Sequence, residues 1–185
     1  MELDERNLAR LQRLADQQEI RDVVYRYCRG IDRRDFDLVR SCYHADATDD
    51  HGDFRGGIDE FIAYVQRTIV RFERTMHFLG NVLIEPVGDS ARAESYAVAY
   101  HRIAASRSQG GRNRPARDFI TGFRYVDDFE RRSGEWRIAT RVVAAEWSRV
   151  DVVDSTGWVP PATATVGRAD KDDVVFAPSL RDRRL

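Results

Sequence analysis

A histidine inside an apolar, strand-like segment is the first residue of this chain whose type and surroundings suggest chemistry. His77 lies in TMHFLGNVLIE, residues 75–85, where strand alternation predicts that it shares a face with Leu79 and Asn81. Such an imidazole is either a core side chain with a satisfied hydrogen bond or a base in a dry site. A carboxylate aimed at the same interior favours the base, because it fixes the ring tautomer and stabilises the imidazolium after proton uptake.

Asp32 is the carboxylate that the sequence offers. Apolar residues at helical spacing predict an amphipathic helix over about residues 8–30, ending at Gly30. Its buried stripe consists of Ile20, Val23, Val24, Tyr27, Cys28 and Ile31. Asp32 lies four residues after Cys28 and continues this stripe just past the predicted helix end. Because an unpaired buried charge is costly, we expect Asp32 to pair with His77.

Two further predicted strands carry ionisable groups among small or apolar side chains. The first has one face formed by Ala93, Ser95, Ala97, Ala99 and His101. The second has one face formed by Arg137, Ala139, Arg141, Val143, Ala145 and Trp147. Small side chains on a concave sheet leave volume, and a dry hollow with a few polar groups is typical of a small-molecule site.

The individual roles of these strand residues stay open at this level. A buried guanidinium needs an anion, so we expect Arg141 either to pair with an acidic side chain such as Asp32 or to receive a substrate oxygen. His101 is either exposed at its strand end or part of the site. The aromatic residues Phe123, Tyr125 and Trp147 belong either to the core or to a pocket wall.

The segment HADATDDHGDF, residues 44–54, brings two histidines and four aspartates together. Imidazole and carboxylate groups are metal ligands, but the spacing matches no recognised ligand set. We therefore predict no metal site and expect a solvated loop at the mouth of the pocket. A substrate contact from His51 is the alternative.

The order of the predicted elements indicates an α+β fold. A short helix with Asp35 as N-cap follows the first helix, and a third begins at the glycines of residues 56–57. The hydrophobic period then changes to two, which predicts strands at residues 76–85, 91–105, 118–130 and 135–150. Residues 1–150 are thus expected to form a single domain, and residues 151–185 an irregular C-terminal extension.

Four segments resemble the SnoaL-like branch of the nuclear transport factor 2-like superfamily over roughly residues 8–150. They are YRYCRGIDRRD, TMHFLGN, ARAESYAVAYHR and FERRSGEWRIATRVV. The resemblance implies a cone-shaped α+β barrel, in which a strongly curved, mostly antiparallel sheet and three N-terminal helices enclose a pocket. Within this branch the chain is most similar to scytalone dehydratase, bile-acid 7α-dehydratase and hexachlorocyclohexane dehydrochlorinase.

The resemblance also implies roles. Asp32 and His77 match the aspartate and the proton-abstracting histidine of these enzymes. Tyr27 matches a tyrosine that the dehydratases use on a leaving or carbonyl oxygen, and Arg141 matches a pocket arginine. His101 approximates a polar pocket position that the dehydrochlorinase lacks, so a chlorinated alkane is not the expected substrate.

We therefore expect a lyase without a cofactor, catalysing a dehydration or a related elimination that includes release of formaldehyde. Its substrate would be a hydroxylated aromatic, steroid-like or polyketide-like molecule. An isomerase or aldol-type cyclase with the same His–Asp dyad is the alternative. A non-catalytic binding module, similar to transport factors or to the small subunit of ring-hydroxylating dioxygenases, is another.

Composition limits the other classes of function. The chain has 30 basic and 31 acidic residues, so no overall field favours nucleic acid or an anionic membrane. No apolar run approaches a membrane span, and the charged segment at residues 1–18 is unlike a signal peptide. We expect a cytoplasmic homo-oligomer, a trimer or a dimer, with Cys28 and Cys42 as reduced thiols.

Overall fold

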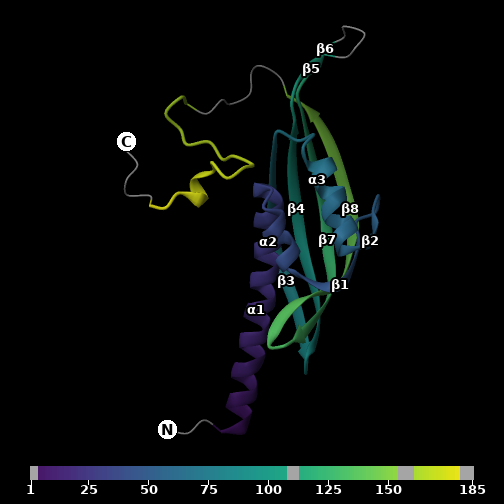
Figure 1. Ribbon diagram of the computed structural model, residues 1–185, viewed down its shortest axis with the longest axis vertical. Coiled ribbons are helices and arrows are strands. Elements are labelled where there is room, and N and C mark those ends of the chain that lie inside the picture. The colour runs from purple at the N-terminus through teal and green to yellow at the C-terminus, as the bar shows by residue number, and fades with distance from the viewer. Residues whose placement is uncertain (1–3, 108–112, 154–160, 180–185) are drawn as a thin grey trace.

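A curved six-stranded sheet forms the body of the protein (Figure 1). The computed structural model describes residues 4–107, 113–153 and 161–179. The strands of the sheet are β1 (Tyr43–Asp50), β2 (Arg55–Gly57), β3 (Arg74–Val87), β4 (Ser90–Ile103), β7 (Arg117–Arg132) and β8 (Glu135–Val152). They are ordered β2-β1-β8-β7-β4-β3, and only β1 and β8 pair in parallel. The predicted α+β class and the mostly antiparallel sheet are confirmed, although the sheet stays open between β2 and β3.

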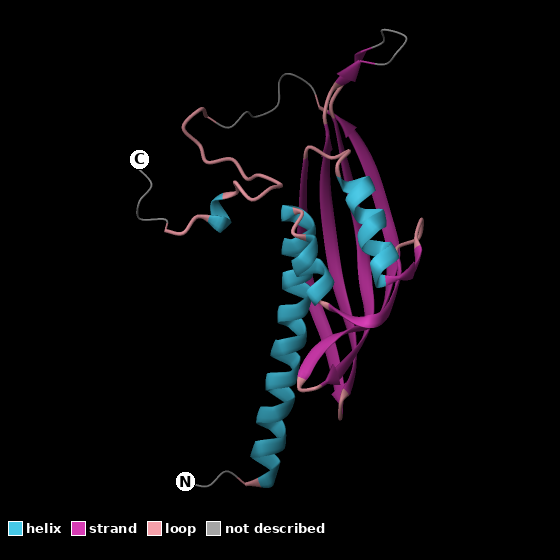
Figure 2. Ribbon diagram, in the orientation of Figure 1, coloured by secondary structure: helices cyan, strands magenta, loops and turns pink. Residues whose placement is uncertain are grey.

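Three helices lie on one side of this sheet (Figure 2). They are α1 (Glu5–Arg33), α2 (Phe36–Ser41) and α3 (Ile58–Ile69). Asp4 caps the start of α1 by accepting a hydrogen bond from the backbone N–H of Asn7, and Asp35 caps α2 in the same way from Leu38. The apolar stripe predicted for α1 is buried, and so are Phe61 and Val65 of α3. These faces form one buried core together with the small side chains Ala91, Ala93, Ala97 and Ala99 of β4.

The prediction that α1 ends at Gly30 is wrong. The helix continues to Arg33 and ends where Arg34 adopts the left-handed conformation, with φ of 53°. Gly30 instead allows α2 to pack closely, because a Cβ there would lie 2.7 Å from Cγ2 of Val39. Asp32 is consequently in the last turn of α1, where the helix fixes the position of its carboxylate.

The loop expected at residues 44–54 is largely strand. Tyr43, Ala47 and Asp49 of β1 are buried, and β1 pairs with β8 and β2. The burial pattern alternates only from Ala47 to Asp50, because the register shifts between Tyr43 and Thr48, and the buried residues include His44 and Asp49. A hydrophobicity pattern therefore does not reveal this strand, and the parallel pairing with β8 determines it.

β-Bulges change which residues face the helices in β3 and β8. The register of β3 against β4 shifts between Leu79 and Val82, so His77 and Leu79 face inwards but Asn81 is exposed. In β8, a shift opposite Phe123 moves Trp147 to the outer face, where its side chain covers Gly122. The predictions that Asn81 and Trp147 line the site are therefore wrong, because each bulge inserts one residue into the alternation.

Short elements complete the described chain. Strands β5 (Ser106–Arg107) and β6 (Asn113–Arg114) pair beyond the ends of β4 and β7, within the predicted polar loop, of which residues 108–112 lie outside the described residues. The 3-10 helix η1 (Val174–Phe176) belongs to the segment of residues 161–179, called the C-terminal segment below. This segment lies beside the C-terminal end of α1 (Figure 1).

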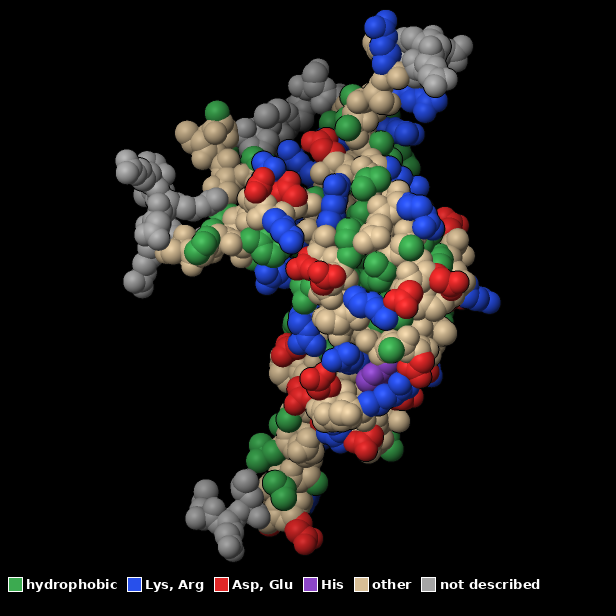
Figure 3. Space-filling model, viewed as in Figure 1, with side chains coloured by type: hydrophobic (Ala, Val, Ile, Leu, Met, Phe, Trp, Pro, Cys, Tyr) green, Lys and Arg blue, Asp and Glu red, His purple; other side chains and the backbone are tan. Residues whose placement is uncertain are grey.

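Basic and acidic side chains are interspersed on the face of the molecule seen in Figure 3. Among the described residues, no helix has the length and apolar character needed to cross a membrane. Cys28 and Cys42 are buried free thiols.

The close approach of α2 predicts an unusual effect of Gly30→Ala. Alanine normally stabilises a helix interior by about 1 kcal/mol relative to glycine. Here we expect a loss of about 1–3 kcal/mol in the free energy of unfolding, because Val39 and the carbonyl of Asp35 leave no room for a methyl group. Urea denaturation measures the change, and Gly57→Ala is the control, since the nearest atom to its Cβ is 3.9 Å away. A stabilised Gly30→Ala variant would contradict this packing.

Candidate functional site

The carboxylate of Asp32 holds His77 by two hydrogen bonds. Oδ1 lies 2.7 Å from Nδ1 of the His77 ring, and Oδ2 accepts the backbone N–H of His77 at 2.9 Å. The pairing expected from the sequence is therefore present. It joins the last turn of α1 to the edge strand β3 and satisfies a backbone donor that no neighbouring strand can reach.

The electrostatics of the pair define its protonation. Burial alone would raise the pKa of the Asp32 carboxyl, but the hydrogen bonds and charge of His77 outweigh burial and hold that pKa below its usual value. An ionised carboxylate only accepts hydrogen bonds, so Nδ1 of His77 carries a proton. Nε2 is then the basic nitrogen of the neutral ring, and no described residue forms a hydrogen bond with it.

His77 and Asp32 open on a cleft of about 350 Å³ between α1 and the edge of β3, called the dyad cleft below. Its walls are largely apolar and include Cys28, Leu79 and Val175. Burial raises the pKa of the Cys28 thiol to about 12, so this side chain is a neutral part of the wall. The guanidinium groups of Arg29 and Arg33 supply positive charge at the same cleft.

His101 lies next to His77, with ring centroids 5.7 Å apart and ring planes nearly perpendicular. Burial, together with the neighbouring His77, lowers the pKa of His101 to about 4, so this ring is neutral at pH 7. Its Nδ1 is buried without a hydrogen-bond partner among the described residues. Of the polar residues predicted for the site, His101 is thus the one that the fold brings beside the dyad.

Arg141 belongs to a separate, fully buried cluster. Its Nε and Nη2 each donate to Asp127 at 2.7 Å, and its Nη1 donates to the Tyr43 hydroxyl. The guanidinium lies between the rings of Tyr27 and Tyr125, at 4.1 and 4.0 Å from their centroids. Burial would lower the pKa of Arg141, but the charge of Asp127 outweighs it and raises that pKa well above its usual value.

This arrangement corrects the expectation for Arg141. Its acidic partner is Asp127 and not Asp32, and its donors are engaged inside the core. The side chain has no exposed surface, so it is not placed to receive a substrate oxygen.

A second His–Asp pair extends the same cluster. Asp49 is buried, accepts the Tyr43 hydroxyl at 2.7 Å and forms a short contact with Nδ1 of His51. Nε2 of His51 lies 3.5 Å from the hydroxyl of Tyr27. Burial raises the pKa of Tyr27, so this phenol stays protonated. The structure thus places Tyr27 and His51 with Arg141, whereas the dyad lies elsewhere.

Aromatic rings separate the two groups of polar residues. Phe123 lies 6.3 Å from His77 and 5.0 Å from Tyr125, which in turn contacts Tyr27 (centroid distances). Both Phe123 and Tyr125 are buried. They belong to the core wall between the dyad and the Arg141 cluster. Among the described residues, no group of three or more His, Cys, Asp or Glu side chains is arranged to hold a metal ion.

A domain model described as SnoaL-like matches residues 12–142, which is more than half of the chain. The chain belongs to the SnoaL-like domain family. The resemblance noted in the sequence is thereby confirmed. Rv2910c, an uncharacterised protein of Mycobacterium tuberculosis (strain ATCC 25618 / H37Rv), is 28% identical over 142 residues, covering 75% of this chain and 90% of that protein.

Solved structures share the SnoaL-like fold of this chain. Hexachlorocyclohexane dehydrochlorinase LinA-type3 from Novosphingobium barchaimii LL02 superposes with a TM-score of 0.66 at 20% identity, covering 82% of this chain and 99% of that one. The Kfla4162 protein from Kribbella flavida superposes with a TM-score of 0.64 at 19% identity, covering 73% and 93%. At these identities the likeness concerns the fold alone.

Sequence reasoning missed several residues that shape the sites of this SnoaL-like chain. Asp127 and Asp49 were not singled out, although Asp127 alternates with Tyr125 and Phe129 and so occupies an inward position. That alternation was the available signal. Val175 of the C-terminal segment also lines the dyad cleft, and nothing in the sequence indicated where this segment would lie.

The buried ion pair predicts a contrast between neighbouring aspartates. Asp127→Ala leaves the Arg141 guanidinium buried and unpaired, so we expect a loss of about 3–5 kcal/mol in the free energy of unfolding. Asp128→Ala removes a half-exposed partner of Arg92 and should cost less than about 1 kcal/mol. Thermal and urea unfolding of both variants measure the difference. Equal losses would show that Arg141 does not depend on Asp127.

The pKa of Asp32 predicts a pH dependence of stability. A carboxyl with a lowered folded-state pKa stabilises the fold above its unfolded pKa, about 3.9, and this contribution is lost as pH falls through the folded value. At pH 6 we expect Asp32→Asn to be less stable than the wild type by about 1–3 kcal/mol. The difference should shrink as the pH is lowered below about 4. Urea titrations across this range test the claim, and a difference independent of pH would refute it.

Proposed function

We propose that the protein is a cofactor-independent lyase that removes water, or a related leaving group, from a small molecule. The observation that supports this is the Asp32–His77 pair, which lines a largely apolar cleft and whose Nε2 has no hydrogen-bond partner among the described residues. A carboxylate-oriented imidazole in such a cleft is suited to remove a proton from carbon next to an activating group, or from a hydroxyl. The SnoaL-like fold shared with a dehydrochlorinase, an elimination enzyme by name, agrees with this chemistry.

The proposed reaction follows from the positions of the polar groups. Nε2 of His77 takes the proton, and the charge of Asp32 stabilises the imidazolium that forms. Departure of the leaving group needs hydrogen-bond donors, and those beside the dyad are His101 and the guanidinium groups of Arg29 and Arg33. Tyr27 and Arg141 are not proposed for this role, because their polar atoms are engaged in the separate cluster.

The shape of the cleft favours a ring compound. A volume of about 350 Å³ is within the range of sites for drug-sized ligands. Its walls present aliphatic and aromatic surface from Leu79, Val175 and Tyr25. We propose a mostly apolar hydroxylated substrate of aromatic, steroid-like or polyketide-like type, with release of formaldehyde as one variant of the elimination.

The same proton abstraction also begins an isomerisation or an aldol-type cyclisation. These reactions differ from elimination in the fate of the carbanion or enolate, which the product reveals. Loss of water or formaldehyde from the substrate mass supports the lyase, whereas a product of unchanged mass supports the isomerase or the cyclase.

The role of His77 is tested by His77→Gln. With a substrate from a panel of hydroxylated ring compounds, we expect kcat to fall by about 10²–10⁴-fold, because general-base catalysis contributes about this much. Mass spectrometry measures product, and circular dichroism checks the fold. His44→Gln is the matched control, since His44 is also buried but bonds the carbonyl oxygen of Glu130 away from the cleft. Undiminished turnover by His77→Gln would reject the base assignment.

We further propose that the protein is a cytoplasmic homo-oligomer, a dimer or a trimer. Phe78, Tyr96 and Trp147 are 66%, 44% and 50% exposed on the outer face of the sheet. Apolar surface of this kind is typical of an interface. Light scattering coupled to size-exclusion chromatography tests the assembly, and a monomer at micromolar concentration would contradict it.

A further inference from the structure

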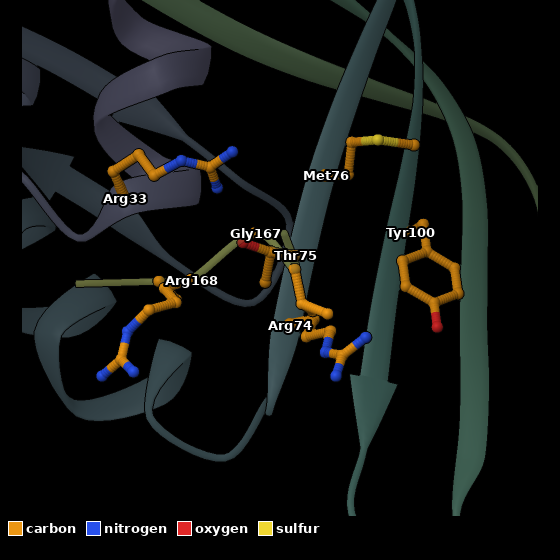
Figure 4. A pocket seen from close by; sticks show the side chains of 9 residues that line it. Arg33, Arg74, Thr75, Met76, Tyr100, Gly167 and Arg168 are labelled. Carbon is orange, nitrogen blue, oxygen red and sulfur yellow. The ribbon is translucent and has the colours of Figure 1, made fainter. Parts of the chain in front are cut away.

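A second cavity, of about 210 Å³, adjoins the dyad cleft between the end of α1, the start of β3 and the C-terminal segment (Figure 4). It is called the Arg33 cavity, because Arg33 lines both it and the dyad cleft. Arg33, Arg74 and Thr75 contribute polar groups to its lining. Gly167 of the C-terminal segment forms part of the opposite wall.

The hydroxyl of Thr75 is a buried polar group that lies beside the Asp32 carboxylate, whose pKa it helps to lower. Thr75 is 7% exposed, and its Oγ1 is in hydrogen-bonding geometry with no described residue, so it can still donate to a ligand. Figure 4 shows this oxygen turned towards Gly167 and the C-terminal segment. A buried hydroxyl without a hydrogen bond costs free energy, so a ligand atom that pairs with it would be favoured.

Arg33 adds an unused donor at the same place. Its Nε lies 3.4 Å from the Asp173 carboxylate, and its Nη1 donates to the carbonyl oxygen of Asp32. Its Nη2 has no hydrogen bond in the described part of the chain and lies 4.0 Å from the position that a Cβ of Gly167 would take. Two nitrogens of the guanidinium, Nε and Nη1, are thus engaged, and Nη2 is left as the donor that Arg33 can offer to a ligand in the cavity that it lines.

Acceptors are scarce inside the cavity. None of its described lining residues is acidic. Arg74 at the rim has only a long contact, 3.7 Å, with Glu73. The third lining arginine, Arg168, is bound to Asp170 and Asp172 outside the cavity and does not contribute. The remaining donors, Arg33 Nη2, the Arg74 guanidinium and Thr75 Oγ1, match a ligand that brings acceptor oxygens and negative charge.

We propose that the Arg33 cavity binds an anionic oxygen group of the substrate, a carboxylate or a phosphate ester, while the attached ring lies in the dyad cleft. This inference rests on the proposed function and names the class of its substrate. Thr75 and His77 are two residues apart on one face of β3, so their side chains are about 7 Å apart. An acid group held at Thr75 therefore leaves a ring carbon within reach of Nε2 of His77.

Binding can be measured without knowing the substrate. The full-length, ¹⁵N-labelled protein is titrated separately with benzoate, phenyl phosphate and benzamide, and the backbone signals of Thr75 and Gly167 are followed by NMR. We expect benzoate or phenyl phosphate to shift these signals and to bind at least about tenfold more tightly than benzamide, which has the same ring without charge. Tighter binding of one anion identifies the carboxylate or the phosphate ester as the natural group.

Three variants locate the site. Thr75→Val and Arg74→Gln should each weaken binding of the preferred anion severalfold, and Arg33→Lys, which keeps the pairing with Asp173, should do so as well. Arg92→Gln is the matched control, because Arg92 is an exposed arginine of the same sheet that contacts Asp128. His77→Gln should retain anion binding even though it lacks turnover, so failure of the base assignment and failure of the anion site are distinguishable.

Two results would overturn the proposal. Equal binding of benzamide and the anions would show that charge is not recognised. Anion binding that Thr75→Val, Arg74→Gln and Arg33→Lys all leave unchanged, or that Arg92→Gln weakens to the same extent, would place the anion elsewhere.

Discussion

The proposed site depends on the two hydrogen bonds that the Asp32 carboxylate accepts from His77. One bond satisfies a backbone N–H at the free edge of β3, and the other fixes the imidazole ring. The end of α1 is thereby attached to the sheet by the same group that defines which ring nitrogen is basic. Removal of this carboxylate would disturb the edge of the sheet and the chemistry together. Asp32 therefore has a structural role and a proposed catalytic role at the same time.

The buried polar residues divide into two groups with different consequences. The Arg141 cluster neutralises its charges internally through Asp127, and two tyrosine rings cover the guanidinium. Such a cluster is expensive to desolvate, and its geometry fixes β7, β8, β1 and α1 relative to one another. At the dyad and its neighbour, in contrast, Nε2 of His77 and Nδ1 of His101 have no hydrogen-bond partner among the described residues. Polar atoms without a hydrogen bond can form one with a ligand, and this would favour binding.

The sequence was sufficient for the parts of the fold that obey simple periodicity. The apolar stripe of α1, the alternation along β4 and the glycine-containing hairpin turns all agree with the structure. The pairing of Asp32 with His77 also followed from the cost of an unpaired buried charge. The prediction that Asn81 and Trp147 face inwards was wrong, because a bulge breaks the alternation near each of them. Strand β1 was missed because its pairing is long-range, and the partner of Arg141 because Asp127 was not considered as an inward residue.

The proposed chemistry depends on the position of a single proton. If the Asp32 carboxylate orients His77 as described, the neutral ring carries its proton on Nδ1 and leaves Nε2 free to accept another. Imidazole ¹⁵N NMR of the neutral His77 ring reports the tautomer directly, and Asp32→Asn provides the comparison. We predict the Nδ1–H tautomer in the wild type and its loss in the variant. A predominant Nε2–H tautomer in the wild type would contradict the proposed role of Asp32, because Nε2 would already carry a proton and could accept no other.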